Sequence, residues 1–246
     1  VNPVILGADI DVVSGDAADD DGSTGATSIT DMTATQAANV TVSDILNTAT
    51  LGVKGATAVG TSDTLNILIS DGDTTTSEDL LGGTATDGAD WTIAGVETIN
   101  LTVTDDFDAD ALNSITGMNK LTATGVGDID IITGAVDMGT NGSVDFSGVS
   151  GAVTFNAAAL ATNPFSYSGG TAVDGVTDGA TGGNVIVLGA GNDTLTLTDK
   201  TAGTAVTTVT GGAGADTITV NMLGNVARDG MKFNFAAGDS VSDTST

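Results

Sequence analysis

Residues 211–219 read GGAGADTIT, and this stretch decides the fold that the rest of the chain predicts. Its glycines allow the backbone to turn with positive φ and to expose carbonyl oxygens. Asp216 adds a hard anionic oxygen of the kind that calcium prefers, and Ile218 has the position of a core residue. Because calcium takes about six to eight oxygen ligands, a neighbouring turn must share the ion.

A second copy of this pattern precedes the first. Residues 188–196 read LGAGNDTLT and keep every specified position except the first glycine, which is Leu188. Nine residues before Asp193 stands Asn184, after two glycines, and this spacing predicts a degenerate repeat in register. From Asp193 to Asp216 the offset is 23 residues, which is not a multiple of nine. We therefore expect residues 199–207 to bulge out or form a side strand, so that the two clear copies are not contiguous.

The same local pattern recurs along the chain as an acid, Thr, an apolar residue, Asn or Thr, and a second apolar residue. Four copies begin at Asp63, Glu97, Asp193 and Asp216. Each has the period-two alternation of a strand, and the repetition predicts stacked coils of one unit. A Thr-rich β chain could produce such pentads by chance, but four copies favour the repeat.

Composition limits the functions that the chain can have. Acidic residues outnumber basic ones 32 to 5, the formal net charge is −27, and there is no histidine or cysteine. This charge disfavours nucleic acid as a partner and favours folding that depends on divalent cations. Without histidine there is no Ser-His-Asp triad and no His general base. The hydrophobic content of 40% and a mean hydropathy of +0.22 argue against disorder.

Nearly all the acids are aspartates, which favour turns and are compact calcium ligands. Further candidate ligands in acidic segments are Asp71 and Asp73, and then Asp106, Asp108 and Asp110. An extended segment places the last three on one face, where they need a cation or full hydration. Alternatively, Asp108 caps a short helix that continues to residue 112. For residues 14–22, a calcium site and a solvated loop are equally good interpretations.

These patterns predict an all-β fold. The short strands of residues 112–160 fit either the coils of a β-solenoid or the strands of a β-sandwich. The repeats favour a right-handed parallel β-solenoid or β-roll with calcium-binding coils toward the C-terminus and irregular loops rich in Asp and Gly. Residues 1–160 form a β-rich, solenoid-like region with acidic loops, and residues 161–246 form the calcium-binding β-roll region; the two are separate or make one elongated domain. No segment has the length of a membrane span. Residues 1–5 do not read as a signal peptide, which predicts a processed start or a piece of a longer chain.

The nonapeptides resemble the calcium-binding repeats of repeats-in-toxin (RTX) proteins, and most of the chain resembles bacterial surface-layer (S-layer) proteins of the RTX-containing, type I secreted kind. Residues 96–102 and 117–125 contribute to the second resemblance. The resemblance implies several bound Ca²⁺ ions, export to the bacterial cell surface and assembly into a regular array. By position it implies carboxylate ligands from Asp193 and Asp216, with carbonyl ligands from Gly189, Gly191, Gly212 and Gly214. Since Leu188 replaces a glycine, a full row of ions is not expected.

Three functions follow from these expectations. The first is a self-assembling extracellular structural protein, an S-layer or surface filament subunit whose copies associate through calcium-bridged contacts. The alternative is a calcium-stabilised binding module of a secreted adhesin, with cell-surface polysaccharide as a further candidate partner. A calcium-dependent lyase is the third, and it is disfavoured because no basic residue lies near a convincing acidic cluster. We therefore expect that the protein is not an enzyme.

Overall fold

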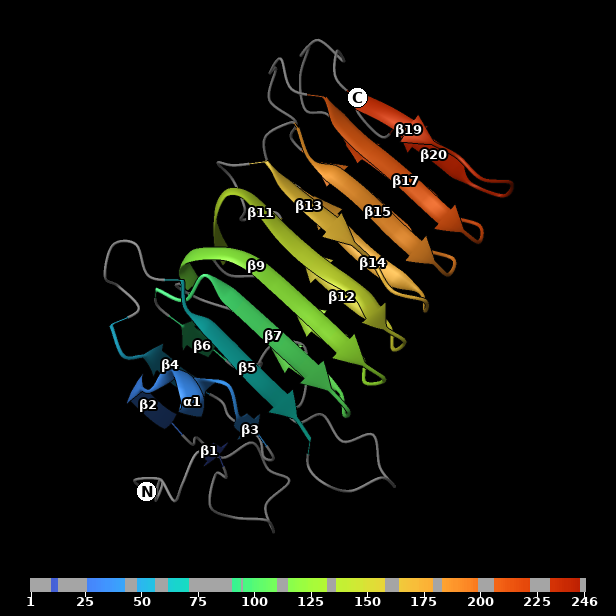
Figure 1. Ribbon diagram of the computed structural model, residues 1–246. Helices are drawn as coiled ribbons and strands as arrows, with labels where there is room; N and C mark the ends of the chain where they lie inside the picture. Colours follow the sequence, from blue (N-terminus) through green and yellow to red (C-terminus); the bar gives the residue numbers. More distant parts are fainter. Residues whose placement is uncertain are drawn as a thin grey trace.

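The computed structural model describes residues 10–12, 26–42, 48–55, 62–70, 90–93, 95–109, 115–131, 136–157, 164–178, 183–198, 206–221 and 231–243. Every strand pairing within them is parallel, and successive coils stack into a β-solenoid. Figure 1 shows the strands of the long sheets lying side by side along one stack, with β19 and β20 at the C-terminal end. The predicted all-β solenoid is therefore confirmed.

Two long sheets and one short sheet form the sides of the stack. The first has ten strands in the order β1 (Ile10–Val12), β3 (Val40–Val42), β5 (Thr64–Ile69), β7 (Thr98–Val103), β9 (Ile115–Gly125), β11 (Val136–Val149), β13 (Phe165–Ser168), β15 (Val185–Ala190), β17 (Thr207–Ala213) and β19 (Met231–Asn234). The second has seven strands, which are β8 (Phe107–Ala109), β10 (Ile129–Ile131), β12 (Val153–Asn156), β14 (Asp174–Asp178), β16 (Thr194–Thr198), β18 (Thr217–Asn221) and β20 (Ser240–Asp243). The short sheet contains β2 (Ala26–Met32), β4 (Thr48–Val53) and β6 (Asp90–Ile93).

The alternation read from the sequence sets which face of each strand is buried. In β5 the side chains of Leu65, Ile67 and Ile69 are buried, and those between them are not. The four acid-Thr-apolar copies all become strands, but they form two pairs. Those after Asp63 and Glu97 are β5 and β7 of the ten-stranded sheet, and those after Asp193 and Asp216 are β16 and β18 of the seven-stranded sheet.

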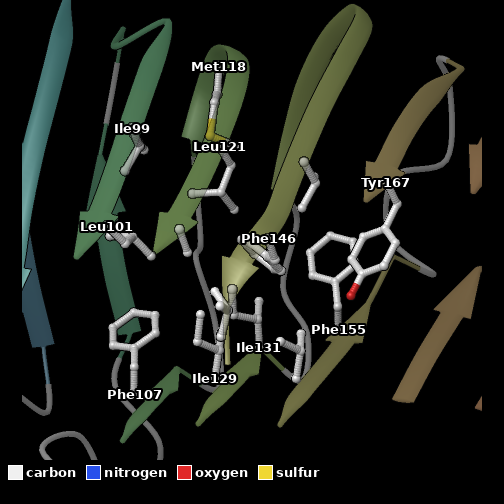
Figure 2. Packing of buried hydrophobic residues seen from close by; sticks show 14 of the residues in the cluster. Ile99, Leu101, Phe107, Met118, Leu121, Ile129, Ile131, Phe146, Phe155 and Tyr167 are labelled. Atoms are coloured by element: carbon white, nitrogen blue, oxygen red, sulfur yellow. The ribbon is translucent and has the colours of Figure 1, made fainter. Parts of the chain in front are cut away.

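The core lies between the sheets. Figure 2 shows aromatic and aliphatic side chains from both sheets meeting there, with Phe155 and Tyr167 beside each other. The rings of Phe155 and Tyr167 stack at 5.6 Å, and Phe146 meets each of them edge-on. These three rings come from β11, β12 and β13 and pack together in the buried core.

The helix in the described residues was not predicted. Helix α1 (Ala34–Ala37) begins with a capping box. The backbone N–H of Gln36 donates to the side-chain hydroxyl of Thr33, and the backbone N–H of Thr33 donates to the side-chain oxygen of Gln36. The alternative helix after Asp108 is wrong for its first residues, because Asp108 and Ala109 belong to strand β8. No helix among the described residues is long enough to cross a membrane.

The prediction that the two clear repeats are separated is wrong. Strand β15 pairs with β17 and β16 pairs with β18, with Gly189 opposite Gly212 and Leu195 opposite Ile218. The two repeats are therefore adjacent coils. An offset of 23 residues also separates Asp216 from Asp239 in the next coil, so 23 is an ordinary coil length and nine is only part of a coil.

Candidate metal centre in the C-terminal coils

One position, at or just before the first residue of each strand of the seven-stranded sheet, changes its chemistry along the stack. In the earlier coils this position holds buried apolar residues, which we call the apolar column: Phe107, Ile129 and Val153. From β14 onward it holds aspartates, which we call the carboxylate column: Asp174, Asp193, Asp216 and Asp239. The predicted ligands Asp193 and Asp216 are therefore brought into one row.

Asp174 was not among the ligands predicted from the sequence. Residues 169–177 read GGTAVDGVT, which keeps the first two glycines, the acid and the apolar residue of the nonapeptide. Ala172 stands where the third glycine is expected, and this substitution hid the repeat. The signal that could have found it is the pair Gly169–Gly170 followed by Asp174 at the same spacing as in residues 211–216.

Hydrogen bonds between coils hold the column in place. Oδ1 of Asp193 accepts the backbone N–H of Asp174 at 2.8 Å, and Oδ1 of Asp216 accepts that of Asp193 at 3.0 Å. Asp239 Oδ1 accepts the N–H of Asp216 at 3.3 Å. Each carboxylate thus binds the coil before it. This arrangement fixes the rotamers and aligns the acids along the stack.

Three carboxylate oxygens of the column, one each on Asp174, Asp193 and Asp216, lack partners among the described residues. Asp174, Asp193 and Asp216 are at most 1% exposed. Asp193 Oδ2 and Asp216 Oδ2 are buried and accept no hydrogen bond from the described residues, and the same holds for Asp174 Oδ1. Leaving such oxygens without partners costs free energy, and charged ones cost more. A cation bound at these oxygens would remove this cost.

Burial and mutual repulsion also disfavour the charged forms of Asp174 and Asp193. Burial, the largest cause, together with the charge of Asp193, raises the pKa of Asp174 from 3.8 to about 6, against hydrogen bonding from Gly170. Burial and the charge of Asp216 raise the pKa of Asp193 to about 6 as well. Adjacent coils are about 4.8 Å apart, and two unit charges at that distance repel by roughly 3 kcal/mol at an effective dielectric constant of 20.

Tyr167 closes the column on the side of the aromatic core. Its hydroxyl donates to Oδ2 of Asp174 at 3.5 Å, and the N–H of Gly170 donates to the same oxygen at 2.9 Å. Burial and the neighbouring charges of Asp174 and Asp193 raise the pKa of Tyr167 well above 10.0. The tyrosine therefore stays neutral and acts as a donor at the first acid of the column.

The motif glycines lie where the coils approach each other most closely. Gly212 has φ 112° and Gly214 has φ 135°, and a Cβ on either would overlap the carbonyl oxygen of Gly189 or Gly191 in the coil before. Gly189 and Gly191 have φ of 108° and 142° and meet the preceding coil in the same way. A Cβ on Gly211 would overlap Oδ2 of Asp216. The glycines thus make room for carbonyl oxygens between coils and for the carboxylate.

The donors present fit a hard cation such as Ca²⁺. Carboxylates and carbonyls are its preferred ligands, and the unsatisfied oxygens of Asp193 and Asp216 lack any other partner among the described residues. No three acidic side chains in the described ranges lie close enough to hold a metal by themselves. Backbone oxygens of the four motif glycines, or water, would have to complete the coordination.

Other predicted ligands lie elsewhere. Asn184 precedes β15 at the other turn of the coil, where its amide accepts from the N–H of Phe165 at 3.1 Å and donates to Asp178 at 2.9 Å. Asp106 lies in the turn of an earlier coil and accepts the N–H of Asp128 at 2.8 Å. Asp108 is opposite Asp130 in the strand pairing. Asp71, Asp73 and Asp110 lie outside the described residues.

Comparison of this chain with protein-family models, with curated proteins and with solved structures finds no match in any of the three.

Proposed function

We propose that the protein is a calcium-dependent, self-assembling extracellular structural protein, a subunit of a bacterial surface layer or surface filament. The observation that carries this proposal is the carboxylate column. Its buried oxygens without partners need positive charge, and calcium outside the cell supplies it at concentrations that the cytosol does not reach.

Calcium would act here as a structural ligand. Asp193 and Asp216 each use one oxygen to bind a neighbouring coil, so an ion on the other oxygen would strengthen coils that are already in register. Because the ion binds the folded chain and not the unfolded one, it stabilises the fold by mass action. The net charge of −27 strengthens this dependence, since the folded chain gathers its negative charge in a smaller volume.

Assembly is supported by the ends of the sheets. Strand β19 closes the order of the ten-stranded sheet and β20 that of the seven-stranded sheet, so each has one strand neighbour among the described residues. The outer edges of these two strands carry backbone N–H and C=O groups that have no strand partner among the described residues, and such groups can pair with a strand of another copy. Phe235, which stacks on Phe233 at 5.8 Å, is 54% exposed next to this edge.

The test is a calcium titration of the chelator-treated protein, followed by far-UV circular dichroism for folding and by light scattering with electron microscopy for assembly. We expect calcium to increase the β signal first and the scattering afterwards, with magnesium much less effective. A signal that is the same in calcium and in chelator would overturn the calcium dependence. Folding without any increase in particle size would overturn the assembly.

A matched pair of double variants distinguishes the loss of charge in the carboxylate column from the loss of charge elsewhere in the chain. Asp193→Asn with Asp216→Asn keeps the oxygens that accept backbone hydrogen bonds but removes two charges from the column. The control is Asp106→Asn with Asp128→Asn, which removes two charges from turns of the earlier coils, where the side chains accept the N–H groups of Asp128 and Ala152. We expect at least a tenfold higher calcium midpoint for the first pair and an unchanged midpoint for the control.

A further inference from the structure

A groove of about 660 Å³ crosses the outer face of the ten-stranded sheet, far along the chain from the carboxylate column. Strands β3, β5 and β7 form its floor, and the residues that follow α1 form one wall. The polar residues of its lining are Asn39, Thr41, Asn66, Asn100 and Thr102, and the apolar residues are Ala38, Val40, Ile67 and Leu68. This hollow is a binding site candidate that the calcium-dependent structural role does not use.

The groove is uncharged in a chain that carries 32 acidic residues. None of the described residues that line it is acidic or basic. A cation, a phosphate or a charged peptide would find no opposite charge there, and ionic ligands depend on such partners. The lining therefore selects for a neutral ligand that forms hydrogen bonds.

A chain of side-chain hydrogen bonds runs along the floor from coil to coil. Thr122 Oγ1 donates to Asn100 Oδ1 at 2.5 Å, Asn100 Nδ2 donates to Asn66 Oδ1 at 2.8 Å, and Asn66 Nδ2 donates to the carbonyl of Ala38 at 3.3 Å. All the donors in this chain point in one direction, so the bonds polarise one another. Both amides are thereby held in fixed orientations.

These hydrogen bonds leave part of each side-chain amide of Asn66 and Asn100 free to bind a ligand. Asn66 and Asn100 each use one of two N–H groups and one lone pair of the carbonyl oxygen in bonds among the described residues. Each therefore keeps one donor and one acceptor for a ligand, next to the half-buried side chain of Leu68. Paired donors and acceptors beside a small apolar surface match the hydroxyl groups and C–H faces of a sugar ring.

We propose that this groove binds a neutral oligosaccharide, which lies across strands β3, β5 and β7. In the strand pairing Asn66 is opposite Asn100, and Asn100 is opposite Thr122, so equivalent polar groups repeat about every 4.8 Å. This repeat is close to the length of one pyranose ring in an extended chain. The ligand would thus place successive rings on successive coils.

Affinity should grow with the length of the sugar. The described lining has no aromatic ring for stacking, so each pyranose gains only hydrogen bonds and contact with Leu68. Linked rings that bind neighbouring coils act together, and each added ring binds as an intramolecular step. A hexasaccharide should therefore bind at least tenfold more tightly than the disaccharide of the same sugar.

The experiment is an NMR titration of the ¹⁵N-labelled full chain in calcium with cellohexaose, maltohexaose and mannohexaose, each next to its disaccharide and to hexagalacturonate as a charged comparison. We expect at least one neutral hexasaccharide to shift the side-chain amide signals of Asn66 and Asn100. The proposal is overturned when none of the three shifts these signals at concentrations that detect a Kd of about 1 mM, or when hexagalacturonate binds more tightly than all three.

Two variants locate the binding. Asn66→Thr with Asn100→Thr removes both amides and keeps residues that suit a strand, and we expect at least a tenfold weaker affinity. The matched control is Asn234→Thr on β19 of the same sheet, where the amide donates to Thr210 at 3.1 Å outside the groove. Equal affinities of the two variants would overturn the assignment. Circular dichroism checks that both variants fold. If the double variant does not fold, the titration of the unaltered chain alone decides whether the groove binds the sugar.

Discussion

The coils up to β12 and the coils from β14 onward share one backbone turn but differ in the residue that the turn directs into the core. In the first part, Gly125 has φ 134° and a Cβ on it would overlap the carbonyl oxygen of Val103. In the second part, Gly212 has φ 112° and meets Gly189 in the same way. Yet the inner position is Ile129 in one and Asp216 in the other. The turn is therefore a property of the glycines and of the stacking.

This difference teaches what the carboxylates add. A coil with Ile129 or Val153 at the inner position gains stability from burying apolar surface, without any ion. A coil with Asp193 or Asp216 there has the same backbone but a buried oxygen without a partner. We expect the coils with Ile129 and Val153 at the inner position to be stable without added ions and the coils of the second part to depend on cations or on low pH.

The largest effect should come from the shared turn itself. Gly125→Val and Gly212→Val each force a side chain into a carbonyl of the preceding coil at a positive φ, and each should lower the free energy of unfolding by more than about 4 kcal/mol. Urea denaturation in calcium measures both. Gly55→Val is the control, because Gly55 also has a positive φ of 79° but has no atom within 4 Å of the added Cβ. A severe loss in only one part would show that the turns are not equivalent.

Moving an acid into the first part should convert it to the second type. Val153→Asp places a carboxyl group at the inner position of β12 and should destabilise the chelated protein by about 3–5 kcal/mol at neutral pH, since the charge is buried without a partner. The control is Thr154→Asp, at an exposed position one residue later. Thermal unfolding in chelator and in calcium measures both. A loss that is equal for the two variants would contradict the role of the inner position.

The two parts should also differ in their response to pH without calcium. The pKa of Asp174 and of Asp193 is about 6 in the folded chain, above the ordinary 3.8, so the folded state binds protons more tightly than the unfolded state. Stability should then be highest below about pH 4, fall as pH rises to about 6, and level off above it, with a loss of up to about 3 kcal/mol for each carboxyl.

Two natural chromophores report on the two parts separately. Trp91 lies in β6 of the first part, and Tyr167 lies beside Asp174, the first acid of the second part. Denaturation followed at Tyr167 should depend on pH in this window more than denaturation followed at Trp91. Stability that rises between pH 4 and 6 at Tyr167 would be the opposite of the expected sign.

The smallest effect should come from the contact between the two parts. Tyr167→Phe removes the hydroxyl that donates to Asp174 at 3.5 Å, a long hydrogen bond, and keeps the ring that stacks on Phe155. We expect a loss of less than about 1 kcal/mol in the free energy of unfolding. Phe146→Leu, which alters the same aromatic cluster without touching Asp174, serves as the control. A loss above about 2 kcal/mol for Tyr167→Phe would assign the junction a larger role.

The sequence predicted the strands well because their apolar residues alternate, and it predicted Asp193 and Asp216 because their turns keep the glycines. It did not predict that these coils are neighbours. The nine-residue repeat covers only one turn and one strand of a coil, and the rest of the coil varies in length. Asp174 was hidden by Ala172, which occupies the glycine position with an ordinary residue. The groove could not be predicted, because Asn39, Asn66 and Asn100 are brought together only by the register of three strands.

The direction of the hydrogen bonds in the carboxylate column has a mechanical consequence. Each acid binds the N–H of the coil before it. Among the described residues, the N–H of Asp193 therefore has Asp216 as its acceptor, and that of Asp216 has Asp239. The series of bonds between coils ends at Asp239. The carboxylate of Asp239 also accepts the N–H of Ala236, and the N–H of Asp239 donates to the carbonyl oxygen of Ala236 in the same coil. Tension applied at the C-terminal end would therefore peel off one coil at a time, and each lost coil would uncover the next buried N–H group.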